Sequence, residues 1–332
     1  MKMFNKSRMA WTISALFLVA VTSCSKDETA NQSLSPGQIL FSSEQAGLTV
    51  KSALISNSDF VADAGSILKT TLHDNATWWT AITDRTGIYS TEARTATGAG
   101  GTLGIVNDEY IADNTAASST FTATIPMFWG VASTIHNFYA YYPYLGGGNV
   151  AASVPVGLLS TQSQLVVNNF AHIGALDFLV ATPIAVISPA NTNQTSHTYV
   201  HLVYNHLFTI LEFNISGSGT IGGIRLTGTD LALAGAQIDI KQVTPVAGIA
   251  YTLANPGSKT GVVIVNLATA ATLSATATDT KVYMIIYPGY AGSCTIEFLN
   301  GGIWKNPVAK QAPAGGFLRG QKYVVTVNAG VI

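Results

Sequence analysis

Charged side chains are scarce in this 332-residue sequence. Asp, Glu, Lys and Arg make up 10% of it, where an ordinary globular protein has roughly a quarter. So few Lys and Glu residues leave little material for exposed helices, and no long segment repeats its apolar residues with a helical period. The formal net charge is −1 and the basic residues are not clustered, which argues against a nucleic-acid-binding surface.

Cysteine is almost absent, since the chain contains only Cys24 and Cys294. If Cys24 is modified, an intrachain disulfide is excluded. Cys294 lies in a strand-like run and is interpreted as a small core residue rather than a nucleophile. The motifs of serine hydrolases, zinc peptidases and phosphate-binding loops are missing, and no pair of carboxylates can be assigned to one cleft. We therefore expect a protein without catalytic activity and without a cofactor.

The N-terminus has the features of an export signal. A basic stretch, residues 2–8, precedes an apolar run, residues 9–21, that is too short for a membrane span of about 20 residues. Residues 21–24 (VTSC) match a bacterial lipobox, which predicts cleavage before Cys24 and acylation of that residue. Several acyl chains would hold the protein on a bilayer, because each buried methylene contributes about 0.8 kcal/mol. The acidic pair in residues 25–28 favours the outer membrane and the cell surface.

Removal of the signal peptide would leave 309 residues (332 − 23) and a net charge of −4, because residues 1–23 contain three basic residues and no acidic one. That length favours two domains, since single cores stop growing near about 250–300 residues. The boundary is predicted in a polar, turn-rich segment, residues 188–194. The predicted parts are a signal peptide (residues 1–23), a lipidated flexible tether (24–37), an N-terminal domain (38–190) and a C-terminal domain (195–332).

The remaining pattern is that of short strands. Residues 207–215 place apolar side chains on one face and Glu212 and Asn214 on the other, which predicts a half-buried strand. Residues 282–287 are apolar on both faces, which is typical of a central strand covered on both sides. Turn signals rich in Gly, Asn and Pro recur between such segments. The pattern predicts an all-β chain built of β-sandwiches.

Two polar patterns have a ligand-binding interpretation. His197, His201 and His206 are close enough in sequence to suggest a metal site, but in a strand His206 points away from the other two, so no metal is predicted. Gly217, Gly219 and Gly222 match a dinucleotide-binding pattern by letter. A strand-like segment follows them instead of a helix, so we predict a hairpin there and no phosphate site.

Aromatic residues form a third pattern. Residues 138–144, together with Trp78, Trp79 and Trp129, could provide a surface on which sugar rings stack. Packing in the core and across strands is the preferred interpretation, because aromatic side chains contribute large apolar areas to β-sheets.

Several of these segments together resemble the fimbrillin family, the lipoprotein subunits of type V pili. The resemblance covers residues 39–328, nearly the whole mature chain, and implies two tandem transthyretin-like β-sandwiches of about seven strands each. The matching segments are residues 86–89 (TGIY), 137–144 (NFYAYYPY), 176–182 (LDFLVAT), 202–213 (LVYNHLFTILEF) and 320–327 (GQKYVVTV).

The resemblance implies assembly by strand exchange, in which the first strand leaves and a strand of a neighbouring subunit replaces it. The candidate for the exchanged strand contains Ile39, Leu40 and Phe41, with Ile39 and Phe41 on one face. Family members are often cut after a basic residue just beyond this strand. Lys51 is the candidate processing site, because no arginine lies between Cys24 and residue 85.

Our first hypothesis is a structural pilus subunit that acts in adhesion, with other subunits, the outer membrane and a host glycan or protein as partners. Only residues 328–332 follow the closing strand, so a tip, anchor or accessory position fits at least as well as the stalk. The alternative is a carbohydrate-binding surface lipoprotein that does not polymerise.

Overall fold

Strands dominate the computed structural model, which describes residues 34–45, 59–62, 71–73, 76–96, 101–146, 148–197, 199–242 and 253–332. Within these residues the helical segments are α1 (Ala171–Gly174) and a short 3-10 turn (Ala277–Asp279). The predicted all-β class is confirmed. No helix in the described part of the chain is long and apolar enough to cross a bilayer. Cys24 and Lys51 lie outside the described residues.

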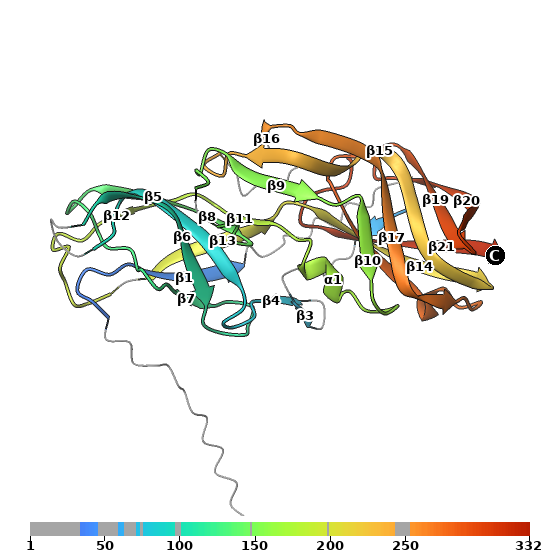
Figure 1. The fold of residues 1–332 in the computed structure, drawn as a ribbon, viewed down its shortest axis with the longest axis horizontal. Coiled ribbons are helices and arrows are strands. Elements are labelled where there is room, and N and C mark those ends of the chain that lie inside the picture. Colours follow the sequence, from blue (N-terminus) through green and yellow to red (C-terminus); the bar gives the residue numbers. More distant parts are fainter. Residues whose placement is uncertain are drawn as a thin grey trace, which may run out of the picture. The chain divides into compact units, whose positions relative to one another are not determined.

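The first sheet closes on itself. Its hydrogen-bonded order is β11-β13-β1-β7-β6-β5-β8-β12, and β11 pairs in addition with β8. The path from β11 to β8 therefore forms a ring without open edges, as in small β-barrels (Figure 1). Its strands are β1 (Leu40–Gln45), β5 (Arg85–Arg94), β6 (Leu103–Ala112), β7 (Thr120–Thr122), β8 (Ile135–Tyr142), β11 (Leu179–Ala181), β12 (Ile184–Ile187) and β13 (Tyr199–His206).

Two further sheets share one core and form a β-sandwich. One has the order β10-β17-β15-β19-β20, with β9 and β16 also paired to β15, and the other has the order β18-β14-β21-β2. The first comprises β9 (Val154–Leu158), β10 (Thr161–Gln164), β15 (Thr220–Ile238), β16 (Leu253–Asn255), β17 (Ser258–Thr272), β19 (Ser293–Asn300) and β20 (Ile303–Gln311). The second comprises β2 (Val61–Ala62), β14 (Thr209–Ser218), β18 (Lys281–Ile286) and β21 (Lys322–Val331), while β3 (Thr71–His73) and β4 (Ala76–Trp78) form a separate pair.

Strands from both sides of residues 188–194 contribute to both regions. β9 and β10 precede that segment but pair with β15 and β17 of the sandwich. β13 follows it but pairs with β1 and β11 of the first sheet. The described chain from residue 35 onward forms one compact unit, and the division into two domains stays a prediction.

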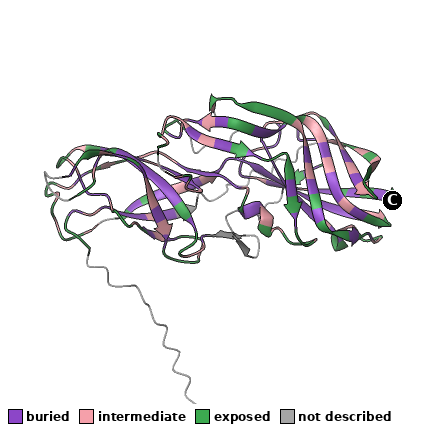
Figure 2. Ribbon diagram, in the orientation of Figure 1, coloured by how far each residue is buried: buried purple, intermediate pink, exposed green. Residues whose placement is uncertain are grey.

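Each region has buried strand residues (Figure 2), and aromatic side chains are among them. Trp79 and Phe138 lie inside the first sheet, and Phe213 and Phe298 lie between the sheets of the sandwich. Gly87 of β5 is opposite Tyr141 of β8, and a Cβ at this glycine would overlap with the Tyr141 ring. Two of the segments that carry the family resemblance thus pack directly on each other.

β14 is buried on both faces, so the prediction of a half-buried strand was wrong. Glu212 is 4% exposed and Asn214 is 9% exposed. The Glu212 carboxylate is 2.9 Å from the Lys281 ammonium and 3.0 Å from the Lys322 ammonium. A carboxylate can be buried here because two cations on the neighbouring strands compensate for its lost hydration.

The glycine-rich turn after β14 also differs from its prediction. β14 and β15 belong to different sheets, so residues 217–219 form an arch between the sheets and not a hairpin. Gly219 has a φ of +102°, and a Cβ there would meet the carbonyl oxygen of Ile332. The end of the chain crosses this arch, where the Ile332 N–H donates to the Ser218 carbonyl.

β18 combines buried faces with an unexpected position. Its residues from Val282 to Ile286 are buried, as predicted. In hydrogen-bonding order, however, the strand is at the edge of its sheet and not in the centre.

The buried cluster of Glu212, Lys281 and Lys322 should be important for stability. We expect Glu212→Gln to lower the free energy of unfolding by about 3 kcal/mol, because it leaves two partly buried ammonium groups without their counter-ion. Urea denaturation measures this change. The control is Glu109→Gln, which breaks the more exposed pair of Glu109 and Arg85 and should cost less than about 1 kcal/mol. Equal losses in the two variants would contradict the assigned role of the cluster.

Candidate functional site

β1 has an interior position in the first sheet, although it is the first strand of the described chain. It pairs in parallel with β13 along its whole length, from Leu40 opposite Tyr199 to Gln45 opposite Tyr204. On its other side it pairs antiparallel with β7 at Phe41 and Ser42. An N-terminal segment is therefore inserted between two strands that come from much later in the chain (Figure 1).

Ile39 and Phe41 of the N-terminal segment face the core, and Leu40 between them is also buried, at 9% exposed. Ile39 is 1% exposed and Phe41 is fully buried. The Phe41 ring packs edge-on against Tyr110 at 5.0 Å and against Phe138 at 5.4 Å between centroids. On the outer face, the Ser42 hydroxyl is 2.6 Å from the imidazole Nδ1 of His201. Burial of a side chain of this size stabilises by about 1.5–3 kcal/mol, so Ile39 and Phe41 together hold β1 firmly.

Backbone hydrogen bonds hold the residues on both sides of Phe41. The Ile39 N–H donates to the Met127 carbonyl at 2.8 Å, and the Ser43 N–H donates to the Ser119 carbonyl at 2.7 Å. Upstream, the Gly37 N–H donates to the Gln194 carbonyl at 2.9 Å. These bonds extend the short pairing with β7 and fix the register of the segment.

The inward-facing residues of β13 that pair with β1 are uncharged. Val200 and Leu202 of β13 face inward, followed by Tyr204, whose hydroxyl is 2.6 Å from the Thr86 hydroxyl. Burial raises the pKa of Tyr204, and it also raises the pKa of Tyr110, so both phenols remain neutral at physiological pH. A strand in this place needs apolar side chains at the positions of Ile39 and Phe41.

The three histidines of the possible metal site have separate partners. The His197 Nε2 is 3.1 Å from the Ser35 carbonyl oxygen, and His201 contacts Ser42 on the outer face. His206 points inward, where its Nδ1 is 2.6 Å from the Asp177 carboxylate. Within the described residues, no group of three or more His, Cys, Asp or Glu side chains is arranged to hold a metal ion.

The pair of Asp177 and His206 links two of the segments that carry the family resemblance. Both side chains are buried, and the second carboxylate oxygen of Asp177 accepts a hydrogen bond from the Phe178 N–H at 2.9 Å. The sequence contained both residues in recognised segments, but nothing in their spacing indicated that they pair.

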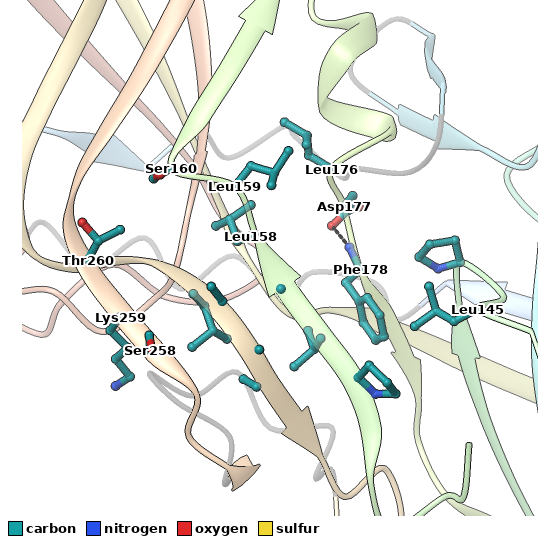
Figure 3. A pocket seen from close by; sticks show the side chains of 18 of the residues that line it. Leu145, Leu158, Leu159, Ser160, Leu176, Asp177, Phe178, Ser258, Lys259 and Thr260 are labelled. Carbon is teal, nitrogen blue, oxygen red and sulfur yellow. Dashed lines mark hydrogen bonds between the residues drawn. The ribbon is translucent and has the colours of Figure 1, made fainter. Parts of the chain in front are cut away.

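Asp177 and Phe178 also line a cavity of about 670 Å³. Figure 3 shows its mostly apolar lining, which includes Leu158 at the end of β9, Leu159 and Leu176. The Asp177 carboxylate is already bonded to His206 and to the Phe178 N–H, and the other polar side chains of the lining are those of Ser160, Ser258, Lys259 and Thr260.

Most of the described aromatic residues that could have stacked on a sugar are in the core. Trp79 is fully buried, Trp129 is 6% exposed, and Phe138 is fully buried. For Trp78 only the backbone is described. The preferred interpretation of this pattern as core packing is confirmed for the buried members, whereas Tyr139 and Tyr144 are half-buried and remain partly exposed.

Cys294 has the environment of an inert core residue. Its side chain is 1% exposed in the sandwich core, and burial raises the pKa of its thiol to about 12. Because the thiolate is the nucleophilic form, this residue is unreactive at neutral pH, in agreement with its interpretation from the sequence.

Comparison with known proteins gives a consistent result. The sequence profile of the fimbrillin-like family matches residues 70–331, which include all five segments that carry the resemblance but not β1. No curated protein matches the chain.

Among solved structures, the chain is similar to a candidate cell adhesion protein from Bacteroides uniformis, with 16% identity, a TM-score of 0.49, and coverage of 88% of this chain and 92% of that chain. For a fimbrial protein from Bacteroides ovatus the identity is 11%, the TM-score is 0.41, and 90% of this chain and 51% of that chain are covered. A fimbrial assembly protein from Parabacteroides distasonis gives 10% identity, a TM-score of 0.40, and coverage of 88% and 90%.

One carboxylate in the first sheet should make stability depend on pH. Burial raises the pKa of Asp108 on β6 to about 6, and its Oδ2 has no hydrogen-bond partner among the described residues. Between about pH 4 and 6 the folded protein therefore binds more protons at this site than the unfolded chain, and stability falls as the pH rises.

We expect Asp108→Asn to raise the melting temperature at pH 7 by roughly 2 °C, because the substitution removes a poorly solvated charge. Thermal melts from pH 3.5 to 8 should show that the gain over the wild type vanishes below about pH 4 and levels off above about pH 6. A gain that does not vary with pH would show that the buried charge is not its cause.

Proposed function

Because this chain belongs to the fimbrillin-like family, we propose that it is a structural subunit of a cell-surface pilus, that it acts in adhesion, and that it has no catalytic role. In this proposal it joins other subunits by strand exchange at the place of β1. The observation that carries the proposal is the insertion of β1 between β13 and β7, with Ile39 and Phe41 in the core.

The physical basis of the exchange is β-augmentation. Loss of β1 would leave two strands with unpaired backbone groups and a groove lined by apolar side chains, which is an unstable and adhesive arrangement. An incoming strand would regain the same ladder hydrogen bonds, and its alternate side chains would set the register. When each subunit fills the groove of the next, the contacts are heterologous and generate an open filament.

The exchange would need a trigger, because the buried side chains and the backbone bonds of β1 resist its departure. Cleavage between β1 and the next described residue, Asp59, would make departure possible by cutting the covalent link. Lys51 lies in this interval and is the proposed processing site. The released segment would carry Cys24 and any lipid attached to it.

The position in the pilus is part of the proposal. Residues 328–331 belong to β21, where Val331 is paired with Ser218. The Asn306 side chain also donates to the Ala329 carbonyl at 2.6 Å and to the Val331 carbonyl at 2.9 Å. In the described structure these residues complete the sandwich, which supports a tip, anchor or accessory position at least as well as a stalk position.

Peptide exchange tests the proposed site. We start from a soluble form without residues 1–24 that carries a site-specific protease sequence between residues 46 and 58. After cleavage, an excess of a labelled peptide of residues 36–46 should replace β1 and remain bound. The same peptide with Phe41→Asp should bind about 10–100-fold more weakly, because an inward-facing apolar side chain is lost.

The matched control is the peptide with Ser42→Asp, which adds the same charge on the outer face and should bind like the wild-type peptide. Fluorescence anisotropy measures the three affinities. In parallel, the protein without residues 38–51 should form oligomers or take up the peptide. If that protein stays folded and monomeric and does not bind the peptide, exchange at β1 does not occur.

The chemistry of the mature N-terminus tests the proposed anchor and processing site. Mass spectrometry of the protein from its native cell should find an acylated Cys24 in the unprocessed form and Ser52 as the first residue of the processed form. Cys24→Ala should abolish acylation, and Lys51→Ala should abolish the cut without affecting acylation. A mature chain that begins elsewhere, or that has no acyl group, would refute the corresponding part of the proposal.

A further inference from the structure

The outer side of β18 is closed in an unusual way. This strand ends the order β18-β14-β21-β2, and within the described residues no strand is paired with its outer side. Its inner side pairs antiparallel with β14, where Met284 is opposite Leu211 and Val282 is opposite Phe213. In an antiparallel ladder, alternate residues direct their N–H and C=O groups to the two sides of a strand. Lys281, Tyr283 and Ile285 therefore direct theirs outward.

Two buried glutamine side chains bond to these outward groups. The Ile285 N–H donates to the Gln162 Oε1 at 3.0 Å, and the Gln162 Nε2 donates to the Ile285 carbonyl at 2.6 Å. The Tyr283 N–H donates to the Gln164 Oε1 at 2.9 Å, and the Gln164 Nε2 donates to the Lys281 carbonyl at 3.1 Å. Each side-chain amide thus takes the place of a peptide group of a neighbouring strand.

The next residues of the chain continue the same contact. The Lys281 N–H donates to the Asn168 Oδ1 at 2.6 Å, and the Asn168 N–H donates to the Lys281 carbonyl at 3.0 Å. The His172 Nε2 is 3.1 Å from the Tyr283 carbonyl oxygen. Burial lowers the pKa of His172, so its imidazole is neutral at physiological pH. All the outward backbone groups of Lys281, Tyr283 and Ile285 therefore have partners between residues 162 and 172.

The glutamines are placed by the other sheet of the sandwich. β10 pairs in parallel with β17, with Gln162 opposite Val265 and Gln164 opposite Leu267. The backbone of β10 thus pairs with β17 in one sheet, while its inward-facing glutamine side chains form hydrogen bonds with β18 at the edge of the other sheet. Gln162 is 2% exposed and Gln164 is fully buried, where apolar residues would be expected at the inward positions of a strand. Polar side chains at these positions are explained by their bonds to β18.

We propose that residues 161–172 are a built-in cover that keeps β18 from pairing with a strand of a second copy of this chain, and that Gln162 and Gln164 hold the cover in place. β18 would be a strong pairing surface without it, because Val282 to Ile286 are apolar on both faces and rich in β-branched residues. The cover confines strand addition to other parts of the molecule. This inference does not depend on whether β1 is exchanged.

Replacement of both glutamines tests the proposal. Methionine has a similar volume but cannot donate the hydrogen bonds of an amide, so Gln162→Met with Gln164→Met should loosen the cover and open the edge. The matched control is Gln194→Met with Gln242→Met, at two positions outside the strands. We expect the variant with Gln162→Met and Gln164→Met to form dimers or larger species between about 10 and 200 µM in sedimentation velocity. The wild type and the control variant should remain monomeric.

Hydrogen exchange locates the contact. In the wild type, the amides of Tyr283 and Ile285 should be protected as strongly as those of a central strand. In the monomeric fraction of the variant they should exchange at least about 10-fold faster, and they should regain protection in the associated fraction. A folded variant that stays monomeric at 200 µM with fast exchange at both amides would overturn the proposal.

If the double variant does not fold, the proposal is tested on the single variants Gln162→Met and Gln164→Met by sedimentation velocity and hydrogen exchange. A folded single variant should associate and lose protection at Ile285 or at Tyr283, respectively. Monomeric single variants with fast exchange at the corresponding amide would overturn the proposal. Fast exchange at both amides in the wild type would also overturn it, because the bonds that define the cover would then not persist in solution.

Discussion

Every backbone N–H and C=O group at the side of a strand needs a partner, and in an all-β protein with few charged residues this constraint shapes the whole molecule. The first sheet satisfies it by closing from β11 to β8. The sandwich cannot close in this way and uses side chains instead. Gln162 and Gln164 bond the edge of β18, and Asn306 bonds the carbonyls near the end of β21.

β1 supplies hydrogen-bond partners for the backbone groups of β13 and β7, so the same constraint makes the first sheet depend on it. Closure of the first sheet depends on β1, which lies between β13 and β7. Its parallel pairing with β13 and the burial of Phe41 hold it in place. If β1 is exchanged as proposed, its loss would leave a groove of defined register that a strand with the same alternation of apolar side chains could fill. The edge of β18 differs from β13 and β7, because side chains of the same fold, and not a separate strand, satisfy its backbone groups.

The few charges inside the protein follow a related rule. Glu212 is buried beside Lys281 and Lys322, and Asp177 is buried beside His206, so in each case a strand neighbour or a nearby segment compensates for lost hydration. The Oδ2 of Asp108 has no such partner among the described residues, and burial raises the pKa of its carboxyl group. Glu212 and Asp177 are thus stabilised in the interior by their partners, whereas the burial of Asp108 results in a higher pKa.

The amino-acid sequence by itself determined the all-β class, the core character of Cys294 and of most of the described aromatic residues, and the family resemblance, because these depend on composition and on local alternation. It also placed Ile39 and Phe41 on one face of a strand. It did not determine that β14 is buried on both faces, that residues 217–219 form an arch between sheets, or that β18 lies at an edge, since each of these depends on which strands pair across the chain. The polar run from Thr161 to Gln164 contains no local signal of burial. Only the tertiary structure brings it against β18, where peptide groups far away in sequence supply the hydrogen bonds that make two buried glutamines stable.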